Sequence, residues 1–445
     1  MTKHAQFAPM GALYDNFDLL VDPAIGIVST VEETAVHPGE PRFFHFAARA
    51  CNTGAFVQQD SFRNTGGASA NRVTAISKAL GEAVERYCAA IYHRDSLPLG
   101  AVEDGRFDCI PPRDFALHSE AQYDAPGFPW APFDDTTLLR WTPVTNLATG
   151  ARSHAPAAMV WIPYVYDRAA GEVPIVQPIS TGLSCHQSYA RSCLSGLSEV
   201  LERDAFTLCW LARCAPPQIR IETLPDDAYD AVQRFEATGD RVVMLDLTTD
   251  NGVPCLLSVL VSEQPDRPAL VFAASCDLDP AVAALKALEE LAHTRRYSQQ
   301  VHSHLPPVSP DRDWHAVQGQ LEHLNVAGDH ANRAAFDFLF ANRTRLDFDA
   351  LPNLATGQTD SDVQAYLDRI AATGHQVYVA DLTSPDVHAL GLCVTRVIVP
   401  GYHPLFLGHG IRALGGKRLL EVPQRLGHPG LDAPEAANPF PHPYP

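Results

Sequence analysis

Three segments of the chain repeat one pattern of glutamates followed by arginine at helical spacing. They are residues 78–87 (KALGEAVERY), 194–210 (LSGLSEVLERDAFTLCW) and 286–295 (KALEELAHTR). In the second segment Glu199 and Glu202 are three residues apart, so a helix places both carboxylates on one side. Aligning Glu82, Glu199 and Glu290 also aligns the apolar positions. We therefore expect three helices that carry carboxylates into one shared site.

Carboxylates crowded into one site repel each other unless cations lie between them. The candidate cations are Mg²⁺ and the arginines that end the three segments, which are Arg86, Arg203 and Arg295. Protein-bound Mg²⁺ is usually held by one or two carboxylates together with substrate phosphates. The mixture of acids and arginines therefore indicates a bound nucleoside triphosphate. For any one segment a solvated helix face is the alternative, but three copies favour the site.

The composition argues against several other classes of function. The chain has 445 residues, a formal net charge of −19 and no lysine- or arginine-rich block, which argues against a nucleic-acid or anionic-membrane surface. Ten cysteines without a C-x-x-C pair are typical of reduced thiols. The sequence shows neither a signal-peptide pattern nor a long apolar run. We expect a cytoplasmic, globular protein of two or three structural units.

Glycine-rich segments precede two of the acidic helices. Residues 65–69 (TGGAS) and 180–186 (STGLSCH) occupy the same place relative to the first and second helix. A glycine-rich turn that enters a helix can offer backbone N–H groups to a phosphate, although most such turns only redirect the chain. We expect turns at both places, and short strands upstream at residues 26–31 and 43–47.

A second repeat indicates the fold class. Residues 237–248 match residues 372–383, each with a helix end, a glycine and a β-run that ends in Asp-Leu-Thr. Further elements are expected at 256–261, 269–274 and 392–399 (strands) and at 314–324 and 331–340 (helices). Units of a helix and two strands indicate an α/β protein with mixed sheets flanked by helices and internal pseudo-repeats. Arg396 lies within one of these strands, where a buried guanidinium needs an anionic partner.

The last eight residues, 438–445, alternate proline with other residues (NPFPHPYP). Such a sequence favours polyproline II, a stiff extended conformation without internal hydrogen bonds. It could deliver the terminal carboxylate of Pro445 to a defined position. The alternatives are a solvated tail or a binding motif for another protein.

Together these motifs resemble the YcaO family. The resemblance rests on the Pro-x-Pro-x-Pro end and on residues 79–87, 180–184, 196–206, 287–290 and 396–401. The subgroup that the sequence resembles most is the azoline-forming cyclodehydratase of thiazole/oxazole-modified microcin pathways. The resemblance implies a YcaO-type fold, with an N-terminal segment (1–60) that contacts a partner and a catalytic domain (61–445).

The resemblance implies ATP- and Mg²⁺-dependent chemistry on a ribosomally made precursor peptide. The side chain of a Cys, Ser or Thr attacks the preceding backbone carbonyl. ATP then phosphorylates the resulting oxygen, and phosphate leaves to give a thiazoline or oxazoline. Transfer of this kind needs positioning and charge neutralisation more than a protein nucleophile.

Carried over by motif, the resemblance assigns roles to individual residues. It implies that Mg²⁺ is held by Glu82, Glu85, Glu199 and Glu202. It implies that ATP is bound by Lys78, Glu82, Glu199, Arg203, Glu290 and Arg396. Arg203 and the terminal carboxylate of Pro445 are the implied catalytic groups, the carboxylate being, or orienting, the base in ring closure. The chain departs from the family pattern where Lys78 replaces a Ser, His293 replaces a Gln and Ala68 replaces the Lys of a Gly-Lys-Gly turn.

The resemblance also implies partners. A precursor peptide is the substrate, a separate E1-like protein recognises its leader, and a flavin-dependent dehydrogenase and a homodimer are further expectations. Three alternatives stay open, namely thioamide formation, macroamidine formation and a noncatalytic scaffold subunit. The Pro-x-Pro-x-Pro end favours azoline formation over the first two. The intact glutamates of the first two helices count against the scaffold.

Overall fold

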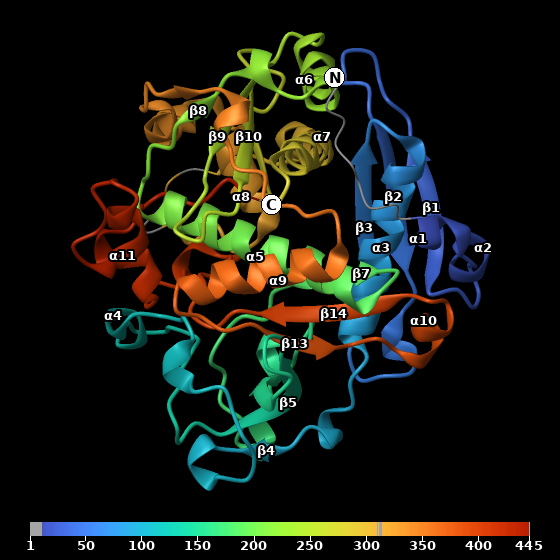
Figure 1. Ribbon diagram of the computed structural model, residues 1–445, viewed down its shortest axis with the longest axis vertical. Coiled ribbons are helices and arrows are strands. Elements are labelled where there is room, and N and C mark those ends of the chain that lie inside the picture. Colours follow the sequence, from blue (N-terminus) through green and yellow to red (C-terminus); the bar gives the residue numbers. More distant parts are fainter. Residues whose placement is uncertain (1–10, 309, 311–313, 445) are drawn as a thin grey trace.

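In the part of the chain that the structure describes, three β-sheets and three long helices alternate around the middle of the molecule (Figure 1). The computed structural model describes residues 11–308, 310 and 314–444. The long helices are α3 (Arg72–Ala90), α5 (Tyr189–Leu211) and α7 (Pro280–His304). Each packs against more than one sheet, so the helices meet at the centre. These are the helices that the acidic segments predict.

The N-terminal sheet is antiparallel and is covered by α3. Its strands are β1 (Val28–Thr34), β2 (Phe44–Ala50) and β3 (Asn64–Ser69). The first two confirm the strands expected at 26–31 and 43–47. The expectation of a turn at 65–69 is wrong, because this segment is β3 and pairs with β2. Its glycines permit close packing, since a Cβ on Gly67 would lie 2.5 Å from the carbonyl oxygen of Ala75 on α3.

The second sheet is buried on both faces and has the strand order β11–β10–β9–β8–β12. Its strands are β8 (Gln218–Ile219), β9 (Arg241–Asp246), β10 (Cys255–Val261), β11 (Leu270–Cys276) and β12 (Arg345–Leu346). Helices α6 (Asp226–Glu236) and α7 pack on one face, and α5 and α8 (Gln320–Gly328) on the other. All residues of β10 and β11 are therefore buried, which explains why all but one residue of each strand are apolar or cysteine.

The third sheet lies under α5 and carries Arg396. Its strands are β4 (Leu99–Gly100), β5 (Leu139–Asn146), β6 (Arg152–Pro156), β7 (Leu183–His186), β13 (Tyr378–Asp381) and β14 (Cys393–Ile398). The expectation of a turn at 180–186 is correct only for its first part. Residues 181–182 turn, but 183–186 form β7, which pairs with β14.

The internal repeat expected from the sequence is present. Helix α6 with β9–β10 corresponds to α9 (Thr359–Ala372) with β13–β14, and in each copy the two strands pair antiparallel. Gly239 and Gly374 follow the two helices with φ of +88° and +84°, a conformation that favours glycine. Asp246 and Asp381 each accept a hydrogen bond from the backbone N–H two residues on, at 2.9 and 3.0 Å. The expected fold class is therefore confirmed.

Shorter helices complete the described chain. They are α1 (Gly11–Asp15), α2 (Phe17–Leu20), α4 (Glu120–Tyr123), α10 (Pro385–Ala389) and α11 (Lys417–Arg425). The helix expected at 314–324 begins only at Gln320, after the extended Gly319, and residues 330–340 form a 3₁₀ helix. Across the described residues, no helix combines the length and apolar character needed to cross a membrane.

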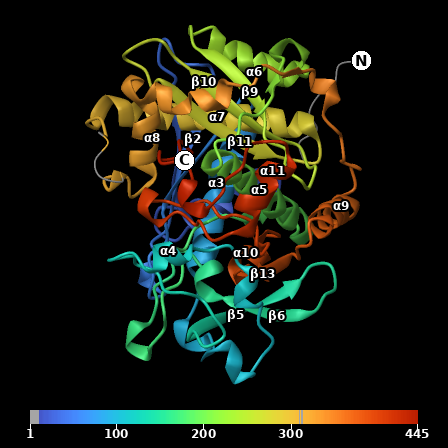
Figure 2. The same cartoon turned by 90° about the vertical axis from the view of Figure 1, so that its left-hand side faces the viewer.

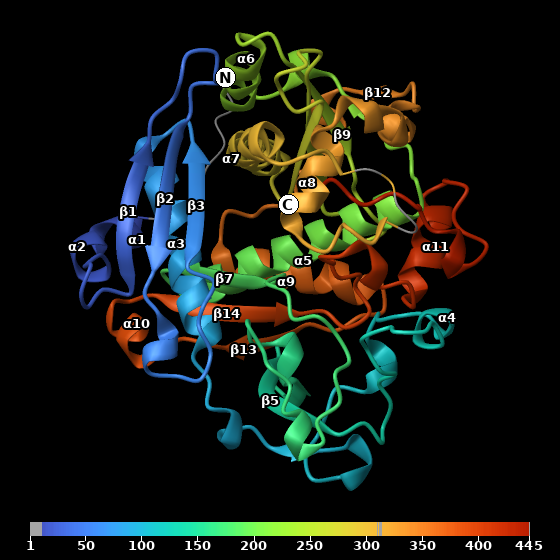
Figure 3. The same cartoon turned by 180° about the vertical axis from the view of Figure 1, so that it is seen from behind.

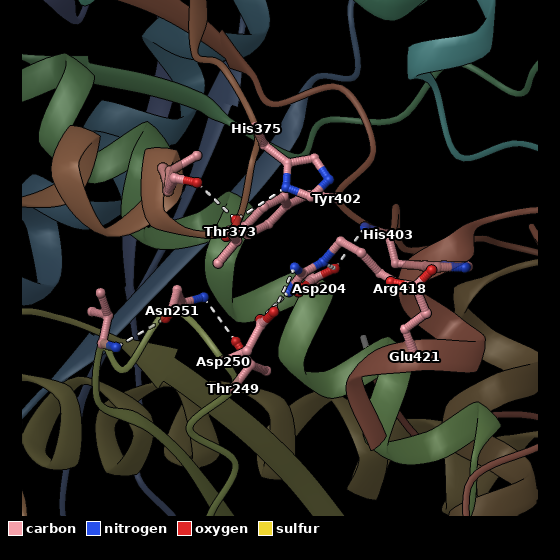
Figure 4. A network of polar contacts seen from close by, with 12 residues as sticks. Asp204, Thr249, Asp250, Asn251, Thr373, His375, Tyr402, His403, Arg418 and Glu421 are labelled. Carbon is pink, nitrogen blue, oxygen red and sulfur yellow. Dashed lines mark hydrogen bonds and ion pairs between the residues drawn. The ribbon is translucent and has the colours of Figure 1, made fainter. Parts of the chain in front are cut away.

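A buried ion-pair network fixes one side of α5 (Figure 4). Arg418 of α11 contacts the carboxylate of Asp204 at 2.7 Å and that of Asp250 at 2.8 Å. The guanidinium of Arg418 also lies over the ring of Tyr402, 4.1 Å from its centroid. The backbone N–H of His403 donates to Asp204 at 2.8 Å. The network connects α11 and the loop after β14 to Asp204 of α5, the residue next to Arg203.

We expect Arg418→Met to lower the free energy of unfolding by about 3 kcal/mol, because it leaves a buried carboxylate without a cation. The control is Arg425→Met on the same helix. Arg425 contacts Asp250 at 3.1 Å but is 49% exposed, so its loss should cost less than about 1 kcal/mol. Urea unfolding followed by circular dichroism measures both. Equal losses would contradict a structural role for the network.

The proline-rich C-terminal segment is buried, so the alternative of a solvated tail is wrong for its described residues. His442 and Tyr444 are 1% and 3% exposed. The indole N–H of Trp210 on α5 donates to the carbonyl of Phe440 at 3.1 Å. The ring of His442 stacks on His323 of α8, with centroids 3.8 Å apart. Figures 2 and 3 show this red end of the ribbon in the middle of the molecule, next to α5.

Stability should fall in mild acid because neutral histidines hold this segment. Burial lowers the pKa of His323 to about 4. Burial, together with His323, His409 and Arg203, also lowers the pKa of His442 well below its usual value. The unfolded chain binds protons on these side chains below about pH 6.5. The stabilisation is therefore complete above that pH and is lost as the pH falls toward the folded-state pKa, by about 3 kcal/mol for His323.

The urea midpoint at several pH values checks this expectation. The midpoint should fall between about pH 7 and about pH 5, and less steeply in His323→Gln than in the parent protein. His37 is exposed, so His37→Gln is the control and should keep the parent slope. An unchanged slope in His323→Gln would show that this histidine does not carry the acid sensitivity.

Candidate active site

Helix α3 brings Glu82, Glu85 and Arg86 to the centre because its apolar face packs on β2 and β3. Glu82 contacts Arg86 at 3.1 Å and accepts a hydrogen bond from the backbone N–H of Gly66 at 3.2 Å. Glu85 accepts one from the N–H of Cys185 on β7 at 3.0 Å. Burial raises the pKa of Glu85 to about 8; Arg86 opposes this shift, and neighbouring carboxylates add to it. Burial of this carboxyl therefore favours its neutral form.

Helix α5 carries the second pair of carboxylates. The guanidinium of Arg203 lies 3.5 Å from Glu199 and 3.3 Å from Glu202. Glu199 also accepts a hydrogen bond from the N–H of Gly182 at 3.2 Å. Gly182 has φ of +85°, and a Cβ there would lie 2.2 Å from the carbonyl oxygen of Val397, so only glycine permits this approach. Burial raises the pKa of Glu202 to about 7, against the opposing effect of Arg203.

Helix α7 places its acids against α3. Lys78 of α3 contacts Glu289 at 2.9 Å and Glu290 at 3.2 Å. Burial alone would raise the pKa of Glu290, but Lys78 and other nearby cations hold it below its usual value. Glu289 is 2% exposed and also accepts a hydrogen bond from the hydroxyl of Ser69. Glu289 is therefore paired within the protein by an ion pair and a hydrogen bond, whereas Glu290 lines a cavity.

The buried C-terminal segment adds Tyr444, which the sequence analysis did not single out. Its hydroxyl donates a hydrogen bond to Glu202. The guanidinium of Arg203 lies over its ring, 4.5 Å from the centroid. The available signal was a single hydroxyl within a proline-rich, mostly apolar end. The predicted catalytic Pro445 lies outside the described residues, so its role stays a prediction.

Arg396 of β14 is the buried cation that the strand pattern predicts. It is 4% exposed, and among the described residues its Nε and one terminal nitrogen have no hydrogen-bond partner. Burial lowers the pKa of Arg396 to about 10; Glu199 opposes this shift and Arg86 adds to it. A buried guanidinium without acceptors is costly, so the site needs an anion.

Within the described chain, adjoining cavities lie between the acidic helices. The smaller, of about 270 Å³, is lined by predicted residues from all three helices, namely Lys78, Glu199, Glu202, Arg203 and Glu290. The larger, of about 720 Å³, reaches Glu85 and Glu199. Both share Glu199, so the structure brings these predicted residues to one place. Glu82 and Arg396 line neither of the two; Arg396 instead borders an apolar pocket of about 100 Å³.

The arrangement fits a triphosphate with Mg²⁺. Among the described residues, no group of three acidic, histidine or cysteine side chains could hold a metal ion unaided. Mg²⁺ is usually bound by one or two carboxylates, with phosphate oxygens and waters completing the octahedron. Glu85 and Glu199 supply carboxylates at the cavity wall. Arg396 keeps two buried nitrogens without a hydrogen-bond partner in the described chain, which suits phosphate. Arg203 is paired with Glu202 but lies on the wall of the smaller cavity, where its charge also suits phosphate.

Three further residues of the site escaped the sequence analysis. Ser195, Ser198 and Lys286 line both cavities. Lys286 contacts Asp277 at 2.9 Å and lies one helical turn before Glu290. The available signal was this helical spacing, because residues four apart share a helix face.

Comparison with known proteins identifies the family. The profile of a family described as YcaO cyclodehydratase, ATP- and Mg²⁺-binding, matches residues 66–403. The chain belongs to the YcaO family. The matched region contains α3, α5, α7 and β14. At the level of the family, the predicted cofactors ATP and Mg²⁺ are confirmed for this YcaO protein.

Relatives of this YcaO protein occur in archaea and bacteria. An uncharacterised protein of Methanothermobacter thermautotrophicus is 26% identical over 339 residues, which cover 75% of this chain and 80% of the relative. An uncharacterised protein from the tfuA 3′ region of Rhizobium leguminosarum bv. trifolii is 28% identical, over 59% of this chain and 60% of its own.

Solved structures share the fold. A heterocyclase in complex with substrate and cofactor has a TM-score of 0.79 at 20% identity, over 98% of this chain and 57% of its own. YcaO from Methanopyrus kandleri, bound with AMPPCP and Mg²⁺, has a TM-score of 0.63 at 21% identity, over 89% and 92%. A chain of the E. coli microcin synthetase McbBCD complex has 0.61 at 15% identity, over 93% and 96%. The YcaO-type fold is confirmed, and the chain spans 57% of the heterocyclase's length.

Proposed function

We propose that this YcaO protein is an ATP-dependent cyclodehydratase that converts Cys, Ser or Thr residues of a ribosomal precursor peptide to thiazoline or oxazoline. The observation that supports this most is the convergence of three acidic helices and the Pro-x-Pro-x-Pro segment at one pair of cavities. The carboxylates and arginines of the three helices suit phosphoryl transfer. The Pro-x-Pro-x-Pro segment brings Tyr444 beside these helices. Similarity to a heterocyclase and to a microcin synthetase chain supports the same class.

The acidic helices hold the nucleotide in this proposal. The four glutamates of α3 and α5 bind Mg²⁺, and Arg203 and Arg396 contact phosphates. Lys78 and Glu290 make further contacts to the nucleotide. When bound, ATP supplies the phosphoryl group that turns an amide oxygen into a good leaving group. The side chains contribute positioning and charge neutralisation rather than a covalent step.

In this proposal the C-terminal end of the chain supplies the base for ring closure. Ring closure requires a base that takes the proton from the attacking thiol or hydroxyl. We assign this role to the terminal carboxylate of Pro445, one residue beyond Tyr444. The hydrogen bond from Tyr444 to Glu202 and the contact of its ring with Arg203 orient this end against α5. A terminal carboxylate on the next residue would act as a general base.

Partners follow from the same proposal. One structural neighbour belongs to the E. coli microcin synthetase McbBCD complex, which is also known with pro-MccB17 bound. We therefore include a precursor peptide and a separate E1-like leader-binding protein. Four further expectations stay predictions, namely a flavin-dependent dehydrogenase, a homodimer, a cytoplasmic location and a domain boundary at residue 60. On that boundary, the structure shows that β1 and β2, which precede it, pair in the same sheet as β3, which follows it.

Mass spectrometry of the peptide tests the proposal. The protein is combined with ATP, Mg²⁺, an E1-like protein and a short Cys/Ser/Thr-rich peptide, both sought among the neighbouring genes. Each azoline should appear as the loss of one water with consumption of ATP. Oxygen-to-sulfur exchange would identify a thioamide instead. Water loss with a cross-link found by fragmentation would identify a macroamidine, and the absence of both turnover and modification would identify a scaffold.

A further inference from the structure

We propose that the larger cavity is the groove that binds the segment of the peptide being modified. The proposal rests on the cyclodehydratase function. The cavity, of about 720 Å³, lies between the N-terminal halves of α5 and α7, strand β7 and the loop before α9. Its volume is within the range of sites that enclose a ligand, roughly 300–1,000 Å³.

The walls of the two cavities are continuous. Along α5, Arg191, Ser195 and Glu199 recur at every fourth position and line the larger cavity, and Ser195 and Glu199 also line the smaller one. Along α7, Lys286 lines both cavities and Glu290 lines the smaller one. The larger cavity therefore leads along two helix faces directly to the carboxylates where the chemistry takes place.

The smaller cavity is the better place for the nucleotide, which its volume of about 270 Å³ encloses only in part. Lys78, Glu290 and Arg203 line it, and Tyr444 forms part of its wall. Lys78, Glu290 and Arg203 are nucleotide contacts of the proposed function, whereas Arg396 lies outside this lining. A nucleotide held there, with its phosphates toward Glu199, leaves the larger cavity for the second substrate. The peptide carbonyl then meets the phosphates at the shared wall.

The size and charge of the groove indicate what it accepts. From Arg191 to Glu199 the helix spans about 12 Å, which is the length of three to four residues of extended chain. Outside the glutamates of the metal site, the charged residues that line the cavity are Arg191, Lys286, Asp277, Asp279 and Asp362, and Lys286 is paired with Asp277 at 2.9 Å. Because the wall mixes both signs with serine and threonine hydroxyls, it suits a polar, uncharged segment. A block of like charges would be repelled by part of the wall.

Hydrogen bonds fix the outer wall of the cavity. In the loop before α9, the N–H of Leu354 donates to the carbonyl of Leu278 at 2.8 Å. The hydroxyl of Thr356 donates to Asp362 at 2.7 Å. Ala355 lies between them, exposed and on the cavity wall. A bulky side chain at this position would narrow the groove without disturbing the core.

Photo-cross-linking tests the groove without requiring turnover. The probe is the uncharged peptide acetyl-Gly-Ser-Cys-Gly-Gly-amide extended with benzoylphenylalanine. We expect cross-links within residues 186–198 or 353–366 of the parent protein. Ala355→Trp should lower the cross-linking yield about tenfold. Ala371→Trp, an exposed alanine on α9 outside the cavity, should keep the parent yield. The affinity for trinitrophenyl-ATP should stay within about twofold in both variants.

Other results overturn the proposal. Cross-links confined to other surfaces, or an unchanged yield in Ala355→Trp, would show that the peptide does not lie in this cavity. A loss of trinitrophenyl-ATP affinity in Ala355→Trp would assign the cavity to the nucleotide. These outcomes are separate from failure of the proposed function, which would appear as unmodified peptide in the mass-spectrometric assay even where the probe binds the groove.

Discussion

Glu199→Gln should lower the rate of ATP turnover at least about 1,000-fold while leaving the fold intact. Glu199 lines both cavities and contacts Arg203 at 3.5 Å. The substitution keeps the shape of the side chain but removes the charge that Mg²⁺ requires. Its amide oxygen can still accept the hydrogen bond from Gly182, so the packing around the turn should not change.

ATP turnover is measured with the partner protein and peptide present, and folding by circular dichroism and melting temperature. Mg²⁺-dependent binding of trinitrophenyl-ATP gives a readout that does not depend on turnover, and it should weaken in this variant. Glu222 is exposed, so Glu222→Gln is the isosteric control and should match the parent protein. Wild-type turnover in Glu199→Gln would refute the assigned role.

Deleting residues 441–445 should lower the rate about 1,000-fold and change ATP affinity much less. The deletion removes the proposed base and also the hydrogen bond from Tyr444 to Glu202. It also removes His442, which is buried against His323, so part of the effect will be lost stability. Narrower variants are therefore needed to separate the causes.

Two variants make this separation. Deleting Pro445 alone moves the terminal carboxylate back to Tyr444, away from its proposed position, and should reproduce most of the loss in rate at unchanged melting temperature. Tyr444→Phe keeps the ring under Arg203 but removes the hydroxyl, and should cost about tenfold, the value of a hydrogen bond to a charged group. A large loss of ATP affinity with little change in rate would count against the base role and would place the segment in nucleotide binding instead.

Local features of the fold could be predicted from the sequence. The spacing of apolar residues and glutamates predicted α3, α5 and α7 because a helix face is set by residues three or four apart. The repeated Gly and Asp-Leu-Thr predicted the helix–strand–strand copies. The prediction of secondary structure failed where contacts with residues distant in the sequence determine the conformation. Residues 65–69 look like a turn because they are glycine-rich, but they pair with β2, and their glycines serve the close approach of α3.

The sequence by itself determined which side chains carry charge and which of them share a helix face, since both depend only on neighbours along the chain. Only the tertiary structure decided which faces meet. Lys78 neutralises Glu289 and Glu290 from another helix, and Tyr444 reaches Glu202 from the far end of the chain. Such contacts depend on how sheets and helices stack, and no spacing in the sequence records that. The groove could not be predicted from the sequence for the same reason, because its walls come from segments that are distant in the sequence.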